Sequence, residues 1–183
     1  MKLVLASKSP RRSEILKNAG FDFVIRTADA DETIAEGTNP EDAVVMLAAR
    51  KAMAVERNKD EIILGADTVV VLDNKILGKP KDREDAFNML KSLSGRVHSV
   101  FTGVCAISDK GSITFAEETK VEFYSLSDEE INEYIDSNDC YDKAGAYGIQ
   151  GLASKFIKGI NGDYFNVVGL PISSIYEKIL KNG

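Results

Sequence analysis

Residues 62–72 read IILGADTVVVL, an apolar run whose one charged residue is Asp67. Such a run is typical of buried strand, and Asp73-Asn74 directly behind it indicates a hairpin turn. A lone carboxylate in this setting is expensive to bury unless it is paired or binds a cation. We therefore interpret Asp67 as a functional residue, because α/β folds place catalytic groups at strand ends and breaks. The alternative is a structural aspartate that caps a nearby loop.

Strands and helices alternate along the rest of the chain. Strands are predicted over 2–6, 21–27, 97–107 and 112–124, and helices over 10–18, 40–58, 82–94, 127–135 and from 171 onwards. Ser9 is the predicted N-cap of the first helix, and Ser127 with Glu130 forms a predicted capping box. Because hairpins recur, the pattern favours an α/β fold with a mixed sheet and flanking helices. The length of 183 residues fits a single domain, 1–183, or one domain with two closely packed lobes.

Composition excludes several classes of protein. A net charge of −6 argues against a general nucleic-acid binder, which usually carries a basic face. The single histidine, His98, makes a His-rich zinc site untenable. Cys105 in an apolar run and Cys140 in a polar loop do not resemble a secreted disulfide framework. Since the sequence shows neither a signal-peptide pattern nor a membrane-spanning run, we expect a cytoplasmic protein without a membrane partner.

The segment SKSPRR, Ser7 to Arg12, is the first candidate anion site. Arg11 and Arg12 in the first turn of a helix oppose the helix dipole. An anion bound there would reverse the sign, gaining from the dipole, the free N–H groups and both guanidinium groups. The alternative is that both arginines are solvated surface residues.

Two lysines are further candidates. Lys51 lies on an Ala-rich predicted helix, where most lysines are merely solvated. Lys79 differs because Gly78 and Pro80 fix the backbone around it, although the spacing is not that of a P-loop.

Acidic and glycine-rich loops complete the candidate set. Residues 29–32 read DADE, and if this loop folds toward Asp67 then two carboxylates would suit Mg²⁺ or Mn²⁺. A harmless acidic turn is the commoner case. The loop over 142–151 contains three glycines, which allow a ligand to approach the backbone. Gln150 in that loop offers an amide donor and acceptor to one hydrogen-bonding edge, whereas a tight structural loop is the alternative.

Taken together, these segments closely resemble the Maf family. The matching stretches follow the family order along nearly the whole chain: Leu5 to Arg12, Gly65 to Val70, Leu77 to Pro80, Ser94 to His98, Thr102 to Val104, Asp142 to Gly151 and Asn166 to Pro171. The resemblance implies a Maf/ITPase-like mixed α/β fold with two lobes around a deep substrate cleft, in a protein that is often a homodimer. It also implies hydrolysis of a nucleoside triphosphate to the monophosphate and pyrophosphate with a divalent metal.

The resemblance further assigns roles to residues. Asp67 matches the family's proton acceptor, and the Gly-Ile-Gln-Gly spelling of 148–151 is similar to the branch that acts on dTTP and UTP rather than on methylated GTP. The expected catalytic residues are Asp67, Lys79, Arg12 and Lys51; the phosphate-binding residues Ser7, Arg11, Arg12, Lys51 and Lys79; the specificity residues Arg11, Thr68 and Gln150; and the metal ligands Glu32 and Asp67.

Two other classes of function stay open at this stage. One is a nucleotide-binding regulator of cell division that uses the same site without turnover. The other is a nucleic-acid-binding regulator, which the acidic isoelectric point of about 4.9 disfavours. A nucleoside triphosphate is the expected small-molecule partner both of the enzyme and of the nucleotide-binding regulator.

Overall fold

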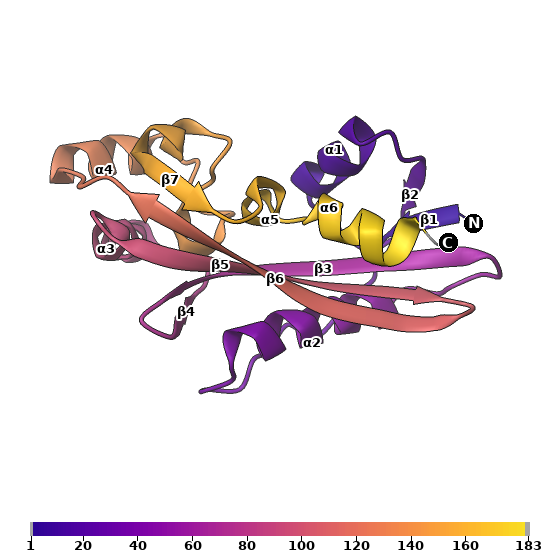
Figure 1. Cartoon of the computed structure of the whole chain (residues 1–183). Helices are drawn as coiled ribbons and strands as arrows, with labels where there is room; N and C mark the ends of the chain where they lie inside the picture. The colour runs from indigo at the N-terminus through magenta and orange to yellow at the C-terminus, as the bar shows by residue number, and fades with distance from the viewer. Residues whose placement is uncertain (1, 182–183) are drawn as a thin grey trace. The chain divides into compact units, whose positions relative to one another are not determined.

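The computed structural model describes residues 2–181 and contains a seven-stranded sheet with helices beside it (Figure 1). The strand order is β2-β1-β3-β5-β6-β7, and β4 pairs with β3. The strands are β1 Lys2–Leu5, β2 Phe23–Ile25, β3 Glu61–Leu72, β4 Lys75–Leu77, β5 Val97–Ser108, β6 Gly111–Phe123 and β7 Ile157–Asn161. The helices are α1 Pro10–Asn18, α2 Pro40–Met53, α3 Arg83–Leu93, α4 Asp128–Asp136, α5 Tyr164–Val168 and α6 Ile172–Ile175. The prediction of a mixed sheet with flanking helices is confirmed.

The chain divides into two compact units. The first unit comprises 1–68, 102–117 and 169–183, and the second comprises 69–101 and 118–168. The strands β3, β5 and β6 each contribute residues to both units. No helix within residues 2–181 combines the length and apolar character that crossing a membrane requires.

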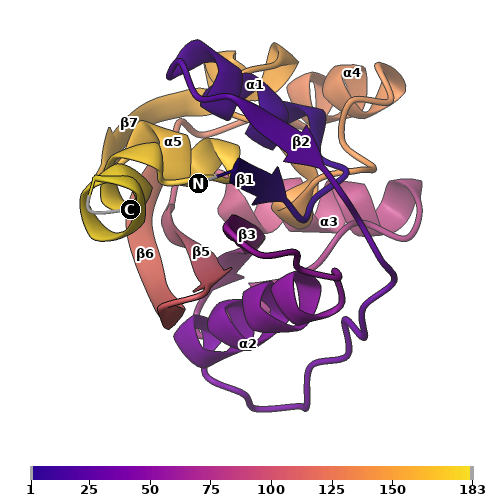
Figure 2. The same cartoon turned by 90° about the vertical axis from the view of Figure 1, so that its right-hand side faces the viewer.

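The first unit is built on parallel strands. β1 pairs in parallel with β2 and with β3, so that Leu5 lies opposite both Ile25 and Leu64. Parallel pairing requires a crossover connection, which α1 and α2 supply. Figure 2 shows α1 on one side of β1 and α2 on the other. Both faces of β1 are therefore covered, and residues 3–5 of this strand are buried.

The helix α2 approaches the sheet unusually closely at two glycines. A β-carbon on Gly65 would lie 2.3 Å from the carbonyl oxygen of Ala48, and one on Gly103 would lie 2.2 Å from the carbonyl carbon of Val44. Both obstacles are helix backbone, which cannot rotate away as a side chain can. The glycines in β3 and β5 thus set the distance between α2 and the sheet.

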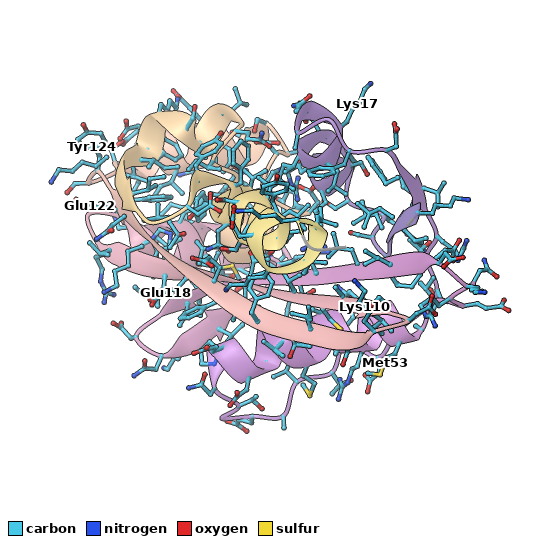
Figure 3. All side chains as sticks on the ribbon, turned by 45° about the vertical axis from the view of Figure 1, so that its right-hand side comes forward. Lys17, Met53, Lys110, Glu118, Glu122 and Tyr124 are labelled. Carbon is cyan, nitrogen blue, oxygen red and sulfur yellow. The ribbon has the colours of Figure 1, made fainter. Side chains whose placement is uncertain are left out.

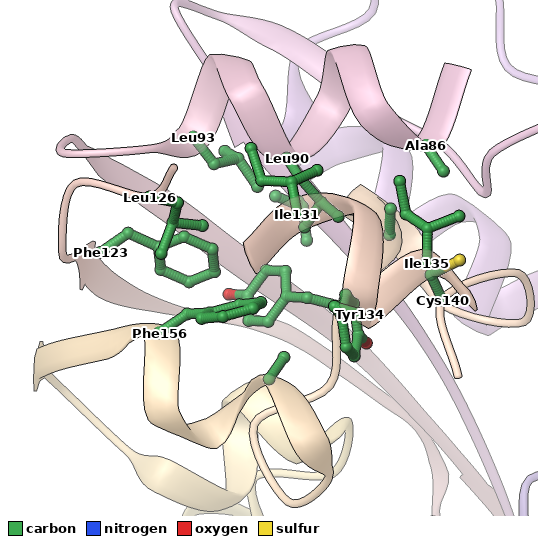
Figure 4. Close-up of a cluster of buried hydrophobic side chains, with 14 of the residues drawn as sticks. Ala86, Leu90, Leu93, Phe123, Leu126, Ile131, Tyr134, Ile135, Cys140 and Phe156 are labelled. Carbon is green, nitrogen blue, oxygen red and sulfur yellow. The ribbon is translucent and has the colours of Figure 1, made fainter. Parts of the chain in front are cut away.

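The second unit has a large apolar core in which helices α3 and α4 pack together. Figure 4 shows Leu90, Ile131 and Ile135 from these helices beside Phe123 and Phe156. The predicted capping box of α4 is present: the Ser127 side chain accepts from the backbone N–H of Glu130, and the Glu130 carboxylate accepts from that of Ser127.

Cys140 lies in a turn, as its polar neighbours indicate, but its burial is not evident from the sequence. It follows a polar sequence, yet its side chain is fully buried in the core of the second unit. The polar neighbours hid this, because Asp139 and Asp142 are engaged by the Lys143 ammonium while the cysteine points inward. Both cysteines are free thiols and buried, as expected for Cys105.

Several predicted boundaries are wrong. The helix expected to reach Asn58 ends at Met53, whose side chain is exposed (Figure 3). The chain reverses beyond it, because the N–H of Asn58 bonds the Glu61 carboxylate and Asp60 adopts a positive φ of 62°. The strand predicted over 21–27 keeps only three residues. Neither β7 nor α5 is predicted, since five residues are too few to show a clear period.

The C-terminal helix also differs from its prediction in form. The α-helical turns cover only Ile172–Ile175, and a π-helical segment over Tyr176–Leu180 follows. A helix of this composition gives no sequence signal for that change of pitch, so a single helix from Pro171 was the natural expectation.

The close approach of α2 gives the first testable prediction. Gly103→Ala places a methyl group against helix backbone, so we expect a loss of roughly 1–3 kcal/mol in the free energy of unfolding. Gly159→Ala is the matched control, because its strand position has open space around it. Urea unfolding of both variants measures the difference. Equal stability of the two variants would show that α2 can move away from the sheet at little cost.

Candidate active site

Asp67 lies in the continuous strand β3, in the first unit, and is half-buried. The Lys51 ammonium lies 2.5 Å from its Oδ1 and 2.7 Å from Glu32 Oε1. One lysine therefore bridges two carboxylates. This ion pair explains how the charge of Asp67 is compensated in an apolar strand. The predicted approach of the acidic loop to Asp67 is found for Glu32, through Lys51.

The fold explains why Lys51 reaches Asp67. Gly65 admits the backbone of α2 at Ala48 and Ala52, one residue beyond Lys51. Two residues after Gly65 on the strand stands Asp67, on the part of β3 that follows the helix contact. Since the helix touches the strand directly, a lysine side chain spans the remaining distance, and its exposed fraction falls to 19%.

The loop that carries Glu32 is tied to the same helix. Arg50 Nη1 donates to the carbonyl oxygens of Asp31 and Thr33, at 3.2 and 2.8 Å. Asp31 Oδ1 in turn accepts from the Thr33 N–H, and hydrogen bonding from Thr33 lowers the pKa of Asp31. Arg50 and Lys51 thus hold neighbouring residues of one loop. The Arg50 side chain binds the loop's backbone carbonyls, and the Lys51 side chain binds the Glu32 carboxylate.

Arg12 forms a second network in the first unit. Its Nε donates to the Gly169 carbonyl at 2.8 Å, Nη1 to Ser7 Oγ at 3.1 Å and Nη2 to Thr68 Oγ1 at 3.2 Å. The Thr68 hydroxyl also bonds Thr102 Oγ1 at 2.9 Å. Arg12 is buried, and this desolvation lowers its pKa. The interpretation of Arg12 as a solvated surface residue is wrong; its role in binding phosphate stays a prediction.

The start of α1 is arranged around Ser7 rather than Ser9. Ser9 occupies the predicted N-cap position, but its side chain makes no capping bond. Ser7 Oγ accepts both the Ser9 N–H, at 3.2 Å, and the Arg12 guanidinium. Arg11 follows on the half-buried side of this turn. The basic residues of the motif therefore differ: Arg12 is held by protein acceptors, while Arg11 retains part of its surface toward solvent.

Lys79 and Gln150 belong to the second unit, and both are exposed. The Gly78 carbonyl, directly before Lys79, accepts from the Gly145 N–H at 3.0 Å. Gln150 occupies a turn that the bond from Gly151 N–H to the Gly148 carbonyl closes. The structure thus connects the Lys79 segment to the loop that carries Gln150.

The glycine-rich loop is tightly built. Gly145 has a φ of 66° and would place a β-carbon 2.9 Å from Val70 Cγ1. Ala146, which has a side chain, also adopts a positive φ, of 62°. A non-glycine residue in that region costs on the order of 1–3 kcal/mol and persists only where surrounding packing imposes it. Three glycines here serve the loop's own geometry, so the structural alternative explains part of the motif.

Comparison with known proteins decides the family. The family model described as "Maf-like protein" matches residues 2–182. The chain belongs to the Maf family. A Maf relative from Thermoanaerobacter sp., named dTTP/UTP pyrophosphatase, is 51% identical over 185 residues, covering 99% of this chain and 96% of its own.

A relative from Bacillus anthracis with the same name is 49% identical over 179 residues, covering 97% of this chain and 94% of its own. A solved structure, that of the Staphylococcus aureus Ham1 protein, is 14% identical with a TM-score of 0.48, covering 67% of this chain and 72% of that one.

The Maf chain offers a limited set of ligands to a divalent cation. Within residues 2–181, no cluster of three or more His, Cys, Asp or Glu side chains is arranged to hold a metal ion. Glu32 and Asp67 do meet at one point, the Lys51 ammonium. Mg²⁺ is commonly bound through one or two carboxylates together with substrate phosphate and water. The pair therefore fits an ion shared with a phosphorylated substrate rather than a permanent protein-bound metal.

Lys51 and a divalent cation would compete for the same two carboxylates. We expect Lys51→Met to raise Mn²⁺ affinity in the absence of nucleotide by roughly tenfold, or about 1.4 kcal/mol. Electron paramagnetic resonance titration of free Mn²⁺ measures this without any turnover. Lys17→Met is the control, because it removes an equal charge from an exposed position of the same unit without loosening the loop that carries Glu32. Affinity in the Lys51 variant at or below that of the control would contradict the competition.

Arg12 gives a separate prediction about stability. A lysine can replace its charge but not its fork of donors, so Arg12→Lys leaves at least one buried acceptor unpaired. We expect this variant to lose about 1–3 kcal/mol in the free energy of unfolding, measured in urea. Arg11→Lys, at the half-buried neighbouring position, should change it by much less. Equal losses would show that the three bonds of Arg12 contribute little.

Proposed function

We propose that this chain hydrolyses dTTP and UTP to the monophosphate and pyrophosphate. The observation that carries the proposal is the Lys51-bridged pair of Glu32 and Asp67, in a chain about half identical, over nearly full length, to relatives named dTTP/UTP pyrophosphatase. That pair supplies the two things the reaction needs in one place: negative oxygens for a proton or a cation, and an ammonium for phosphate.

Asp67 is the proposed proton acceptor. Water attacks the α-phosphorus, its proton passes to the Asp67 carboxylate, and pyrophosphate leaves with the electrons of the broken P–O bond. The half-buried position in a rigid strand fixes the carboxylate, so orientation is set before substrate binds. Glu32 and Asp67 would hold a divalent cation, Mg²⁺ or Mn²⁺, which would supply positive charge for the triphosphate and for the leaving group.

The phosphate charges require local cations, because the chain as a whole carries a net charge of −6. We assign Lys51, Lys79 and Arg11 to the binding of phosphate. Arg12 donates to three protein oxygens, one of them on Ser7. We therefore propose that Arg12 chiefly positions Ser7 and Thr68, and that any contact it makes with phosphate uses the remaining N–H groups of a guanidinium that is already oriented.

Gln150 is the proposed reader of the base, with Thr68 and Arg11 as further specificity residues. Uracil and thymine present an N3–H donor beside the O4 acceptor, and an amide can meet both. Cytosine reverses that pattern. A freely flipping amide satisfies either base, so Gln150 discriminates only if its orientation is fixed. The closed turn of 148–151 supports this assignment, because it limits how the amide is presented.

The remaining expectations accompany this function. We propose that residues 1–183 act as one catalytic domain, supported by a family match over 2–182 and by strands that contribute to both units. Two free buried thiols agree with a reducing cytoplasm. We also propose that the protein is a homodimer. At this net charge we propose no stable nucleic-acid partner. Sedimentation of the protein with and without DNA tests both proposals.

Product analysis tests the function. With UTP and Mg²⁺ we expect pyrophosphate and UMP in equal amounts, and Asp67→Asn should lower turnover by at least about a hundredfold, since general-base catalysis typically contributes 10²–10⁴. Asp22→Asn, an exposed acid of the same unit, is the control. Accumulation of UDP and orthophosphate would refute α–β cleavage. Tight UTP binding without any product would instead identify a nucleotide-binding regulator.

A further inference from the structure

His98 is a buried group that the proposed reaction does not use. It lies in β5, within the motif SGRVH over 94–98, and its side chain is 3% exposed. Its Nε2 lies 2.7 Å from the Tyr147 hydroxyl oxygen, a hydrogen bond across 49 residues of sequence. Tyr147 belongs to the glycine-rich loop, three residues before Gln150. Both residues are in the second unit.

The two hydrogen-bonded rings pack against each other and against a third ring, that of Phe123. His98 meets Phe123 and Tyr147 edge to face, with centroids 5.1 and 5.4 Å apart, and Phe123 meets Tyr147 at 4.8 Å. Burial lowers the pKa of His98 to about 4 and raises the pKa of Tyr147, so both side chains are neutral at pH 7. The contact is therefore one hydrogen bond between two neutral groups, in which either the imidazole Nε2–H or the Tyr147 hydroxyl is the donor.

Packing alone does not account for a histidine here. Within residues 2–181, the buried Nδ1 of His98 has no hydrogen-bond partner. A buried polar atom without a partner costs free energy that a phenylalanine of similar shape would not incur. What histidine provides beyond an apolar ring is the bond to Tyr147. The buried imidazole of His98 is thus explained by its hydrogen bond, which holds the Tyr147 side chain in place.

Tyr147 is the last buried anchor before the base-reading turn. Gly148 and Ile149 are half-buried, Gln150 is exposed, and the next buried side chain is that of Ala153. The turn itself is closed by the Gly151 N–H and the Gly148 carbonyl, 3.3 Å apart. The direction in which the turn leaves the core therefore depends on where Tyr147 is held, together with the buried Tyr134, whose hydroxyl hydrogen-bonds the Gly148 backbone.

The backbone before Tyr147 needs such an anchor. Gly145 and Ala146 both have positive φ, so two successive residues stand in the left-handed region. Alanine leaves that region unless its surroundings prevent it. Upstream, the bond between the Gly145 N–H and the Gly78 carbonyl holds the strained pair. Downstream, the first side chain able to hold it is Tyr147.

We propose that His98 is a positioning residue for base choice: through the Tyr147 hydroxyl it fixes the turn over 148–151 and so the orientation of the Gln150 amide. This inference rests on the proposed function of Gln150. It separates two effects of Tyr147, the ring, which packs the core, and the hydroxyl, which sets the turn. Removing the hydroxyl alone leaves the ring contacts in place and frees the turn.

A double-mutant cycle tests the route through Gln150. The variants are Tyr147→Phe, Gln150→Ala and the two together, and the measurement is kcat/KM for UTP divided by that for CTP. Gln150→Ala should narrow this ratio by about tenfold, and Tyr147→Phe by about threefold to tenfold. In the Gln150→Ala background, Tyr147→Phe should leave the ratio within about twofold, because the residue it positions is gone.

Two controls separate positioning from a general effect on folding. Tyr124→Phe removes a hydroxyl from an exposed tyrosine of the same unit (Figure 3) and should leave the ratio unchanged. His98→Gln keeps a hydrogen-bonding group toward Tyr147 and should restore part of the ratio that His98→Leu loses. Urea midpoints for each variant report folding, and if His98→Leu does not fold then the Tyr147→Phe cycle decides alone.

The same nucleotides as non-hydrolysable α,β-methylene analogues, titrated by calorimetry, provide a readout that needs no turnover. Wild-type protein that binds the uridine analogue in preference to the cytidine analogue without hydrolysing UTP would refute the proposed function and still test His98. An equal fall for both nucleotides in Tyr147→Phe would overturn the inference. So would additive changes of Tyr147→Phe and Gln150→Ala in the ratio, or a wild type without preference in binding.

Discussion

The direct contact of α2 with the sheet is the constraint on which the first unit depends. Gly65 and Gly103 lack the β-carbon that would strike the helix backbone, and in consequence Lys51 reaches Asp67. The Lys51 ammonium compensates the charge that the half-buried Asp67 places in β3, since removing the partner of a desolvated carboxylate is destabilising. Two glycines in the sheet therefore set the helix distance that lets an ion-paired aspartate lie in an apolar strand.

Arg12 plays a comparable part for the segments that are far apart in sequence. Its guanidinium joins the start of α1, strand β3 and the chain at Gly169 through three acceptors. A basic residue usually attributed to ligand binding is here also a structural crosslink. A guanidinium held by protein oxygens would lose little conformational entropy on binding an anion, so the observed bonds are compatible with the proposed phosphate contact.

The sequence predicted the pairing of Asp67 better than it predicted the short elements and long-range contacts of the structure. The apolar run around Asp67 indicated a paired or cation-binding acid, and Lys51 with Glu32 confirms the pairing. The capping box located α4, and Pro10 at the first helical position located α1, since both signals are local. Short elements such as β7 could not be predicted, because their stability comes from pairing with β6. The Tyr147 contact of His98 spans 49 positions, and no local pattern reports it.

The strands β3, β5 and β6 carry the chain from one unit to the other, so neither unit is a continuous piece of sequence. The first unit includes residues from Gly169 onward, which are synthesised well after its N-terminal segments, and Arg12 finds its Gly169 acceptor only then. Proteins usually fold on the ribosome from the N-terminus, unit by unit. The N-terminal segments of this chain therefore lack part of their core until these later residues have been synthesised. Removing about a dozen residues from residue 172 onward would deprive the first unit of that part of its core.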